Sequence, residues 1–327
     1  MSISDRVQAF VFPGQGSQKV GMGRGWTERS AAAREAFAEA DDALGFSISK
    51  LCWEGPEDEL GLTANTQPAL LATSIAIYRA LLAEGGFAWN PVAMAGHSLG
   101  EYSALVAAEA LDFGDALRLV RKRGKLMQEA VPVGVGGMAA VIGLDGDVLT
   151  EVAAEARSGH PDEVCAVANL NAPGQTVLAG HKSAIERAAE IAKARGARKV
   201  SILAVSAPFH SPLMRPAREK MAEHLAAVAF HDPRIPVISN VDAVPVATGE
   251  AARDALVRQI DGSVRWVESV RWMAEQAGAS LFFEVGPGSV LCGLVRRIAE
   301  GARAVHLPEP ELLDKWLAEA REVESEA

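Results

Sequence analysis

The fold is decided by a strand, a tight turn and a helix that follow one another without a break in Val92-Ala93-Met94-Ala95-Gly96-His97-Ser98-Leu99-Gly100-Glu101-Tyr102-Ser103-Ala104-Leu105. Val92 to Ala95 is a short apolar run typical of a buried strand, and Glu101 to Ala110 has the pattern of a helix. Gly96-x-Ser98-x-Gly100 matches the nucleophile elbow, a sharp turn that pushes a serine hydroxyl out of the surface. The segment therefore predicts an α/β fold with Ser98 as a catalytic nucleophile. The structural alternative is a serine N-cap in a tight turn.

On both sides of this segment, apolar runs alternate with helical patterns, which predicts a mainly parallel sheet. We expect a first strand at Gln8 to Phe12 and further strands at Lys199 to Ser206 and Leu281 to Val285. A helix is expected from about Asp112 to Ala130. With 327 residues, 49% of them hydrophobic, the chain can form one large core and a smaller domain beside it.

The middle of the chain has a different order of elements. Strands are expected at 138–144, 164–169, 176–179 and 198–205, and helices at 147–157 and 182–195. This β-α-β-β-α-β order is the ferredoxin-like arrangement. We therefore expect a ferredoxin-like small domain at residues 131–199, inserted into a large α/β catalytic domain of residues 1–130 and 200–310. Residues 311–327 are expected to be a C-terminal tail, either a surface helix or partly disordered.

Composition argues against several classes of protein. A formal net charge of −10 is unfavourable for binding nucleic acid, which requires a basic surface. Cys52, Cys165 and Cys292 are widely spaced and odd in number, which predicts neither a disulfide framework nor a metal site and fits a reducing cytoplasm. The first residues lack the pattern of a signal peptide, and the longest apolar run, Val133 to Leu144, is too short to span a bilayer. A cytoplasmic protein without a membrane partner is expected.

A serine nucleophile needs a base, and His210 is the best candidate. It follows the strand expected at 199–206 and precedes Ser211-Pro212, which has the pattern of an N-cap and a first helical residue. Active sites of α/β sheets lie at such strand ends. His97 adjoins Ser98, but sequence neighbours diverge on a turn, so we expect it to shape the elbow instead.

Two backbone N–H groups are expected to form the oxyanion hole. One belongs to Leu99, which follows the nucleophile, and the other to Gln15, in the loop Pro13-Gly14-Gln15-Gly16-Ser17-Gln18. Gly14 and Gly16 would allow that loop to approach closely. The alternatives are a tight turn without a ligand, or a phosphate loop, although the Gly-Lys-Ser/Thr ending of such loops is missing.

One arginine of the helix expected at Asp112 to Ala130 falls on the apolar side. At about 100° per residue, Arg123 lies between Val120 and Leu126 in the apolar arc, whereas the opposite face holds the other basic residues, Arg118, Arg121, Lys122 and Lys125. A buried guanidinium requires a carboxylate or dense hydrogen bonding. An internal salt bridge to a core Asp or Glu would meet this requirement.

Several motifs, in the same order, resemble those of malonyl-CoA:acyl carrier protein transacylases. Besides Gly96 to Leu105 they are Phe12 to Gln18, Thr66-Gln67-Pro68-Ala69-Leu70, Arg123-Gly124 with Met127-Gln128, Asn169 to Gly174, Pro208-Phe209-His210-Ser211 and Glu284-Val285-Gly286-Pro287-Gly288. The resemblance runs from about residue 8 to residue 300. It implies a hydrolase-like α/β domain with a ferredoxin-like insert, in agreement with the order of elements.

The resemblance also implies roles for individual residues. Arg123 would bind the free carboxylate of malonyl as a planar, bidentate fork. Gln67 and Phe209 would contact the substrate, and a bulky residue at 209 goes with malonyl rather than methylmalonyl. The backbone carbonyl of Gln259 would orient the imidazole of His210, in place of the usual carboxylate.

The implied reaction is a ping-pong transfer of malonyl from malonyl-CoA, through a malonyl-serine, to the phosphopantetheine thiol of an acyl carrier protein. No metal or other cofactor is implied, and the family suggests a monomer. A stand-alone chain fits fatty-acid synthesis, and a free-standing acyltransferase of a polyketide pathway is the alternative.

Two other functions are considered for this chain. A serine esterase or thioesterase would send the acyl-serine to water and would have no use for a buried arginine. A non-catalytic scaffold that docks carrier proteins would need neither the elbow nor the histidine. The mass of the chain after mixing with malonyl-CoA separates these functions.

Overall fold

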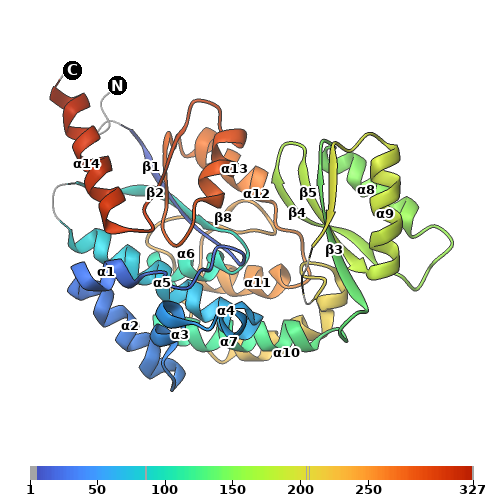
Figure 1. The fold of residues 1–327 in the computed structure, drawn as a ribbon, viewed down its shortest axis with the longest axis horizontal. Helices are drawn as coiled ribbons and strands as arrows, with labels where there is room; N and C mark the ends of the chain where they lie inside the picture. Colours follow the sequence, from blue (N-terminus) through green and yellow to red (C-terminus); the bar gives the residue numbers. More distant parts are fainter. Residues whose placement is uncertain (1–5, 85–86, 204, 206, 326–327) are drawn as a thin grey trace.

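Two sheets of different topology organise the chain in the computed structural model, which describes residues 6–84, 87–203, 205 and 207–325 (Figure 1). The large sheet has the strand order β10 (Arg303–His306), β9 (Leu281–Glu284), β1 (Gln8–Phe12), β2 (Pro91–Gly96), β7 (Val237–Ile238) and β8 (Pro245–Val246). Its pairs are parallel except for β7 with β8. The expected α/β class with a mainly parallel sheet is confirmed.

Both faces of the large sheet are covered, because its central strands are apolar on both sides. Every residue of β1 is buried, and alternate residues point into two separate cores. Phe10 and Phe12 pack with helices α2 (Ala31–Leu44), α5 (Thr63–Ala83) and α7 (Phe113–Glu129). Ala9 and Val11 pack with the opposite layer, which includes α12 (Trp266–Arg271) and α13 (Val290–Ile298).

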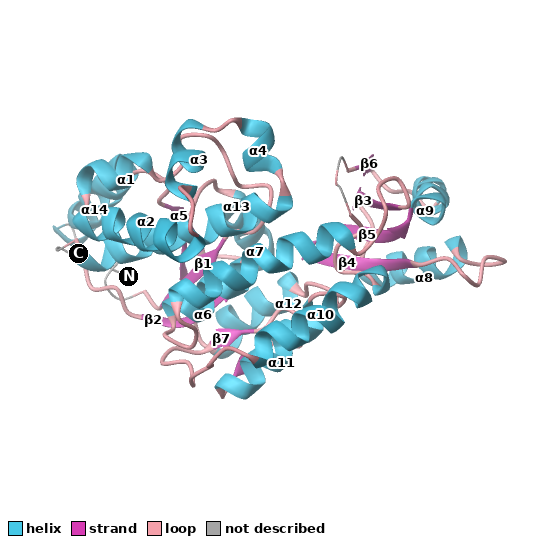
Figure 2. Cartoon of the chain, turned by 90° about the horizontal axis from the view of Figure 1, so that it is seen from below, coloured by secondary structure: helices cyan, strands magenta, loops and turns pink. Residues whose placement is uncertain are grey.

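The small sheet forms a second lobe beside the large one (Figures 1 and 2). It is antiparallel, in the order β4 (Cys165–Ala172), β5 (Gln175–His181), β3 (Gly136–Ile142) and β6 (Lys199–Ile202). Helices α8 (Gly146–Ala156) and α9 (Lys182–Ala194) cover one face, which gives the ferredoxin-like topology. The other face packs against Leu203 and Phe209. The order of elements expected from the sequence is thus present.

The strand expected at Lys199 to Ser206 is shorter than the sequence indicated. As β6 it ends at Ile202, it pairs with β3 of the small sheet, and residues 204 and 206 lie outside the described part of the chain. Pro208 lies a few residues on and cannot donate a ladder hydrogen bond. His210 therefore reaches the site on a loop between the lobes and not directly at a strand end.

The remaining helices are α1 (Arg24–Arg29), α3 (Ile48–Glu54), α4 (Glu57–Gly61), α6 (Gly100–Ala107), α10 (Arg215–Ala226), α11 (Gly249–Gln259) and α14 (Pro310–Ser325), with a 3-10 turn at Pro212–Met214 and a π-helical turn at Trp272–Gln276. The last helix is anchored, because Leu313 and Trp316 are buried in the main core. Residues 1–5, where a signal peptide would begin, are outside the described part. Among the helices that the structure describes, none is long and apolar enough to cross a membrane.

Candidate active site

Ser98 lies in a strained turn between β2 and α6, as the elbow motif predicts. Its φ is 52°, in the left-handed region that non-glycine residues rarely adopt. A Cβ on Gly96 would lie 1.8 Å from the backbone of Gly100, and one on Gly100 would lie 2.1 Å from the carbonyl oxygen of Phe12. Both glycines are therefore required for the turn to close against β1.

Asn240, just after the neighbouring strand β7, holds this turn in place. Its Oδ1 accepts a hydrogen bond from the backbone N–H of Ser98 at 2.7 Å, and its Nδ2 donates to the carbonyl of Gly96 at 2.7 Å. Asn240 is fully buried, and its bond to Gly96 is shielded from water, whereas the bond from Ser98 is partly buried. Local strain of this kind persists where the surroundings over-determine it.

His210 is within hydrogen-bond distance of the nucleophile. Its Nε2 lies 2.7 Å from Ser98 Oγ, and its Nδ1 lies 2.9 Å from the carbonyl oxygen of Gln259 and 3.2 Å from that of Gly262. Because a carbonyl can only accept, Nδ1 carries the proton, and Nε2 of the neutral ring is free to accept the serine proton. The carbonyl of Gln259 thus lies beside the Nδ1 of His210 that it would orient.

The surroundings of His210 keep its ring neutral. Burial, and then the positive charge of Arg123, lower the pKa of His210 to about 3, against the opposing effect of the Gln259 and Gly262 carbonyls. A neutral imidazole is the form that can act as a base.

The two backbone N–H groups expected to form the oxyanion hole are both near Ser98. A Cβ on Gly14 would lie 2.4 Å from the carbonyl oxygen of His97, so the glycine loop packs directly on the elbow. Gln15 lines the same cavity as Ser98. Neither the N–H of Gln15 nor that of Leu99 donates a hydrogen bond to another described residue. Both are therefore available to an incoming oxyanion.

Arg123 is buried, as its place in the apolar arc predicts, and it points at the nucleophile. Only 1% of the residue is exposed. Its Nη1 donates to Gln67 Oε1 at 2.9 Å, and its Nη2 donates to Gln259 Oε1 at 2.8 Å and Ser98 Oγ at 3.2 Å. All three acceptors are uncharged, its Nε has no partner, and among the described side chains no carboxylate forms an ion pair with it. Among the described residues, Arg123 therefore forms no internal salt bridge to a core Asp or Glu.

These groups line a cavity of about 400 Å³ between the two lobes. Ser98, His210, Arg123 and Gln67 lie in its wall with the backbone loop of Gln15. The small lobe contributes an apolar side, made of Met138, Val177, Leu203 and, from the loop, Phe209. The cavity can therefore hold an acyl group between a nucleophile, a cation and an apolar wall.

His97 has a structural position. Its Nε2 lies 2.8 Å from Asn171 Oδ1 in β4, and its ring packs edge-on against Trp266. The elbow is thereby tied to the small lobe. His97 makes no hydrogen bond to Ser98 among those of the described residues.

Sequence reasoning missed Glu101 and Asn240. Glu101 is only 1% exposed, and its carboxylate binds Gln259 and the backbone of Asn240. A charged residue at the start of the mostly apolar helix that follows the elbow was a signal for it. Asn240 follows a two-residue strand, too short to be recognised from its pattern. Among the described residues, no group of three or more His, Cys, Asp or Glu side chains is placed to hold a metal ion.

Several known proteins are similar to this chain in sequence. The model of the acyl transferase domain family matches residues 9–322. Malonyl CoA-acyl carrier protein transacylase of Escherichia coli (strain K12) is 50% identical over 305 residues, which are 93% of this chain and 97% of the relative. The Bacillus subtilis (strain 168) protein of the same name is 45% identical, over 94% of this chain and 95% of its own length.

Solved structures of similar proteins superimpose on this chain. An acyl-carrier-protein S-malonyltransferase of Burkholderia pseudomallei 1710b superimposes with a TM-score of 0.91 and 51% identity, over 95% of this chain and 99% of the other. A malonyl-transacylase in complex with a type II polyketide-synthase acyl-carrier protein gives a TM-score of 0.91 and 46% identity, over 96% and 99% of the two chains.

Proposed function

Because this chain belongs to the acyl transferase domain family, we propose that it transfers malonyl from malonyl-CoA to the phosphopantetheine thiol of an acyl carrier protein. The choice of malonyl as the acyl group rests on the buried guanidinium of Arg123. It is buried, its Nη2 lies 3.2 Å from Ser98 Oγ, and its hydrogen-bond acceptors among the described residues are neutral oxygens. A carboxylate held there by a bidentate fork would satisfy a charge that the described residues leave without an ion pair.

The first half of the reaction acylates Ser98. Arg123 holds the malonyl carboxylate, so that the thioester carbon lies next to Ser98 Oγ. As Oγ attacks, its proton passes to Nε2 of His210, and the carbonyl oxygen becomes an oxyanion that accepts from the N–H groups of Leu99 and Gln15. Collapse of this intermediate breaks the carbon–sulfur bond. Nε2 returns the proton to the departing coenzyme A thiolate, and malonyl remains on Ser98.

The second half repeats these steps with another thiol. The phosphopantetheine thiol gives its proton to Nε2 of His210, and its sulfur attacks the malonyl-serine carbonyl. The same two N–H groups stabilise the oxyanion. The carbon–oxygen bond to Ser98 then breaks, Nε2 protonates Oγ, and malonyl leaves as the new thioester. Charges and protons balance without a cofactor.

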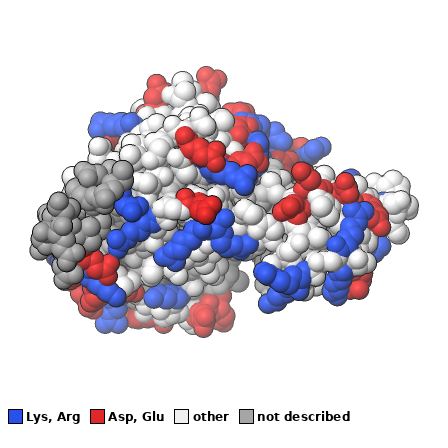
Figure 3. All heavy atoms as spheres, turned by 90° about the horizontal axis from the view of Figure 1, so that it is seen from above, with Lys and Arg blue, Asp and Glu red and all other residues white. Residues whose placement is uncertain are grey.

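An acidic carrier protein would require basic side chains near the cavity, although the whole chain is acidic. Figure 3 shows Lys and Arg side chains on both lobes of the face it draws, mixed with Asp and Glu. The net charge of −10 therefore does not prevent a local basic surface. We propose a cytoplasmic monomer that serves fatty-acid synthesis. A polyketide carrier is the second candidate, because one similar structure contains such a partner.

The test is the intact mass of the chain after mixing with malonyl-CoA. A lasting malonyl adduct that disappears when a carrier-protein thiol is added supports the transferase. Release of malonate to water without the thiol would indicate a hydrolase, and an unchanged mass would indicate a scaffold.

Replacing Arg123 by Ala should separate recognition of the acid from the chemistry. Losing a charged hydrogen-bond partner in a dry site costs about 2–5 kcal/mol, which corresponds to roughly 30-fold to several thousand-fold in malonyl transfer. Acetyl transfer from acetyl-CoA needs no carboxylate contact, so the ratio of acetyl to malonyl kcat/KM should rise steeply. Equal losses for the two thioesters, with a lower melting temperature, would instead give Arg123 a structural role.

A further inference from the structure

Glu101 and Arg123 are two buried charges with a single amide group between them. Oε2 of Glu101 accepts a hydrogen bond from Nε2 of Gln259 at 2.7 Å. At the other end of the same amide, Oε1 accepts from Nη2 of Arg123 at 2.8 Å. Anion, amide and cation therefore form a row, with the amide dipole aligned to both charges.

This row can form in one orientation only. A carboxylate can only accept hydrogen bonds and a guanidinium can only donate them, so the Gln259 amide must turn its NH₂ to Glu101 and its oxygen to Arg123. Nε2 of Gln259 also donates to the backbone carbonyl of Ser98 at 2.8 Å. Rotation of the amide would break three bonds and oppose both charges.

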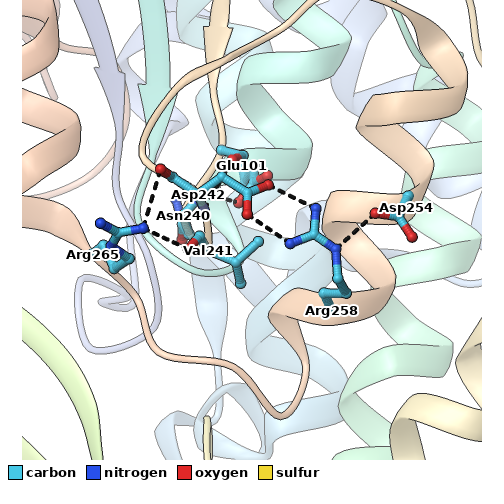
Figure 4. A network of polar contacts seen from close by, with 8 residues as sticks. Glu101, Asn240, Val241, Asp242, Asp254, Arg258 and Arg265 are labelled. Atoms are coloured by element: carbon cyan, nitrogen blue, oxygen red, sulfur yellow. Dashed lines mark hydrogen bonds and ion pairs between the residues drawn. The ribbon is translucent and has the colours of Figure 1, made fainter.

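The other charged groups near Glu101 are already paired. Asp242 receives two bonds of 2.7 Å from Arg258, which also binds Asp254 at 2.7 Å (Figure 4). Arg265 donates to the backbone carbonyls of Val241 and Asp242 and pairs with Glu268. These contacts hold the turn whose Asn240 N–H donates to Glu101 at 3.0 Å. Because Arg258 and Arg265 are paired with other carboxylates, Arg123 is the nearby cation whose charge Glu101 can balance.

Opposing effects act on the pKa of Glu101. Burial raises the pKa of Glu101 to about 7, whereas the hydrogen bonds from Gln259 and Asn240 and the charge of Arg123 act in the other direction. Asp242 adds to the rise. Burial likewise lowers the pKa of Arg123, and Tyr102 and Glu101 oppose this. Each charge of the pair thus favours the ionised form of the other.

We propose that Glu101 is the remote counter-ion of Arg123, and that the Gln259 side chain is a specificity-determining spacer between them. The spacer lets Glu101 stabilise the buried guanidinium without contacting it. Arg123 therefore remains available for the carboxylate of the acyl group. The specificity part of this proposal rests on the proposed malonyl transfer.

The distance between the charges matters for a physical reason. A carboxylate in direct contact with Arg123 would form an internal ion pair, and the substrate carboxylate would have to displace it. Without any carboxylate nearby, the empty site would hold an uncompensated cation, which is strongly destabilising in a protein interior. One intervening amide avoids both outcomes.

The first test exchanges the two side chains in the double variant Glu101→Gln with Gln259→Glu. The exchange keeps the net charge and the backbone carbonyl beside His210, and it brings the carboxylate to Arg123. It removes the bond from residue 259 to the Ser98 carbonyl, a loss that malonyl and acetyl transfer share. The ratio of malonyl to acetyl kcat/KM should fall by about 30-fold or more, because malonyl must compete with an internal partner. Using a ratio cancels any loss common to both thioesters. An unchanged ratio in the folded variant would overturn the spacer role.

The second test needs no substrate. Glu101→Gln, Arg123→Met and the double variant are compared by melting temperature, because each single change leaves one buried charge without its counter-charge. The double variant should lose clearly less than the sum of the two single losses. Additive losses would refute the counter-ion, even if the exchange variant failed to fold. Coupling found in a chain that forms no malonyl adduct would support the counter-ion and refute the proposed function.

Discussion

The Ser98→Ala variant is expected to fold and to take up no malonyl from malonyl-CoA. The change removes the hydroxyl oxygen to which the proposed mechanism attaches the acyl group, so the adduct should be lost entirely and transfer should fall to background. The fold should survive, because alanine carries the same Cβ at φ 52° and, among the described residues, the hydroxyl bonds only with His210 and Arg123. Intact mass after mixing with malonyl-CoA measures the result directly.

Ser103→Ala is a matched control for this variant. Ser103 is buried on α6, the helix that follows the turn of Ser98, but it does not line the cavity. Its alanine variant should acquire the malonyl mass as the wild type does. A malonyl adduct on the Ser98→Ala chain, or loss of the adduct in Ser103→Ala alone, would remove Ser98 from the role of nucleophile.

Local patterns predicted the elements that hold the catalytic groups. The strand at Gln8 to Phe12 was predicted with its observed bounds, because Ala9 to Phe12 is wholly apolar and Pro13-Gly14 follows at once. The helix that carries Arg123 was predicted within a residue at each end, since Asp112 caps it and the apolar arc is continuous. Arg123 could be recognised as buried because helical periodicity alone places it among apolar neighbours.

Long-range contacts could not be predicted in the same way. Asn240 and Glu101 hold the elbow and the Gln259 amide across more than a hundred residues of sequence, and no local pattern encodes such a pairing. The loop that delivers His210 was taken for a strand end, because apolar residues continue after Ile202 although the ladder with β3 stops there. The carbonyl of Gln259 came from the resemblance, since a backbone oxygen has no side-chain signature.

Replacing His210 by Ala should slow malonyl transfer by about two to four orders of magnitude, the usual contribution of a general base. His210 Nε2 lies 2.7 Å from Ser98 Oγ, and within the described structure His97 instead contacts Asn171. Rates of transfer to the carrier thiol in His210→Ala and His97→Ala measure this difference. Near-normal transfer in His210→Ala together with an inactive His97→Ala would show that the wrong histidine had been chosen.

The acid limb of the pH profile of kcat/KM should also identify His210 as the base, because the pKa of His210 is lowered to about 3. A lowered pKa means that the neutral, basic form persists as the pH falls, so kcat/KM should not decline between pH 7 and pH 5. A histidine with the ordinary pKa of about 6.5 would be roughly 3% neutral at pH 5 and would lose activity about thirtyfold. The pKa of Glu101, raised to about 7, lies at the edge of this pH range. The pH profile is therefore also measured in Glu101→Gln, where that carboxylate is absent.

Binding of malonyl-CoA should raise the pKa of His210. The charge of Arg123 is one cause of the low pKa, and a malonyl carboxylate bound to Arg123 would compensate that charge. Because kcat/KM reports the free enzyme and kcat the complex, the acid limb of kcat for malonyl-CoA should lie at higher pH than that of kcat/KM. With acetyl-CoA, which brings no carboxylate, the two limbs should coincide. A midpoint near pH 6.5 in kcat/KM, or equal displacement with both thioesters, would contradict the coupling between the base and the arginine.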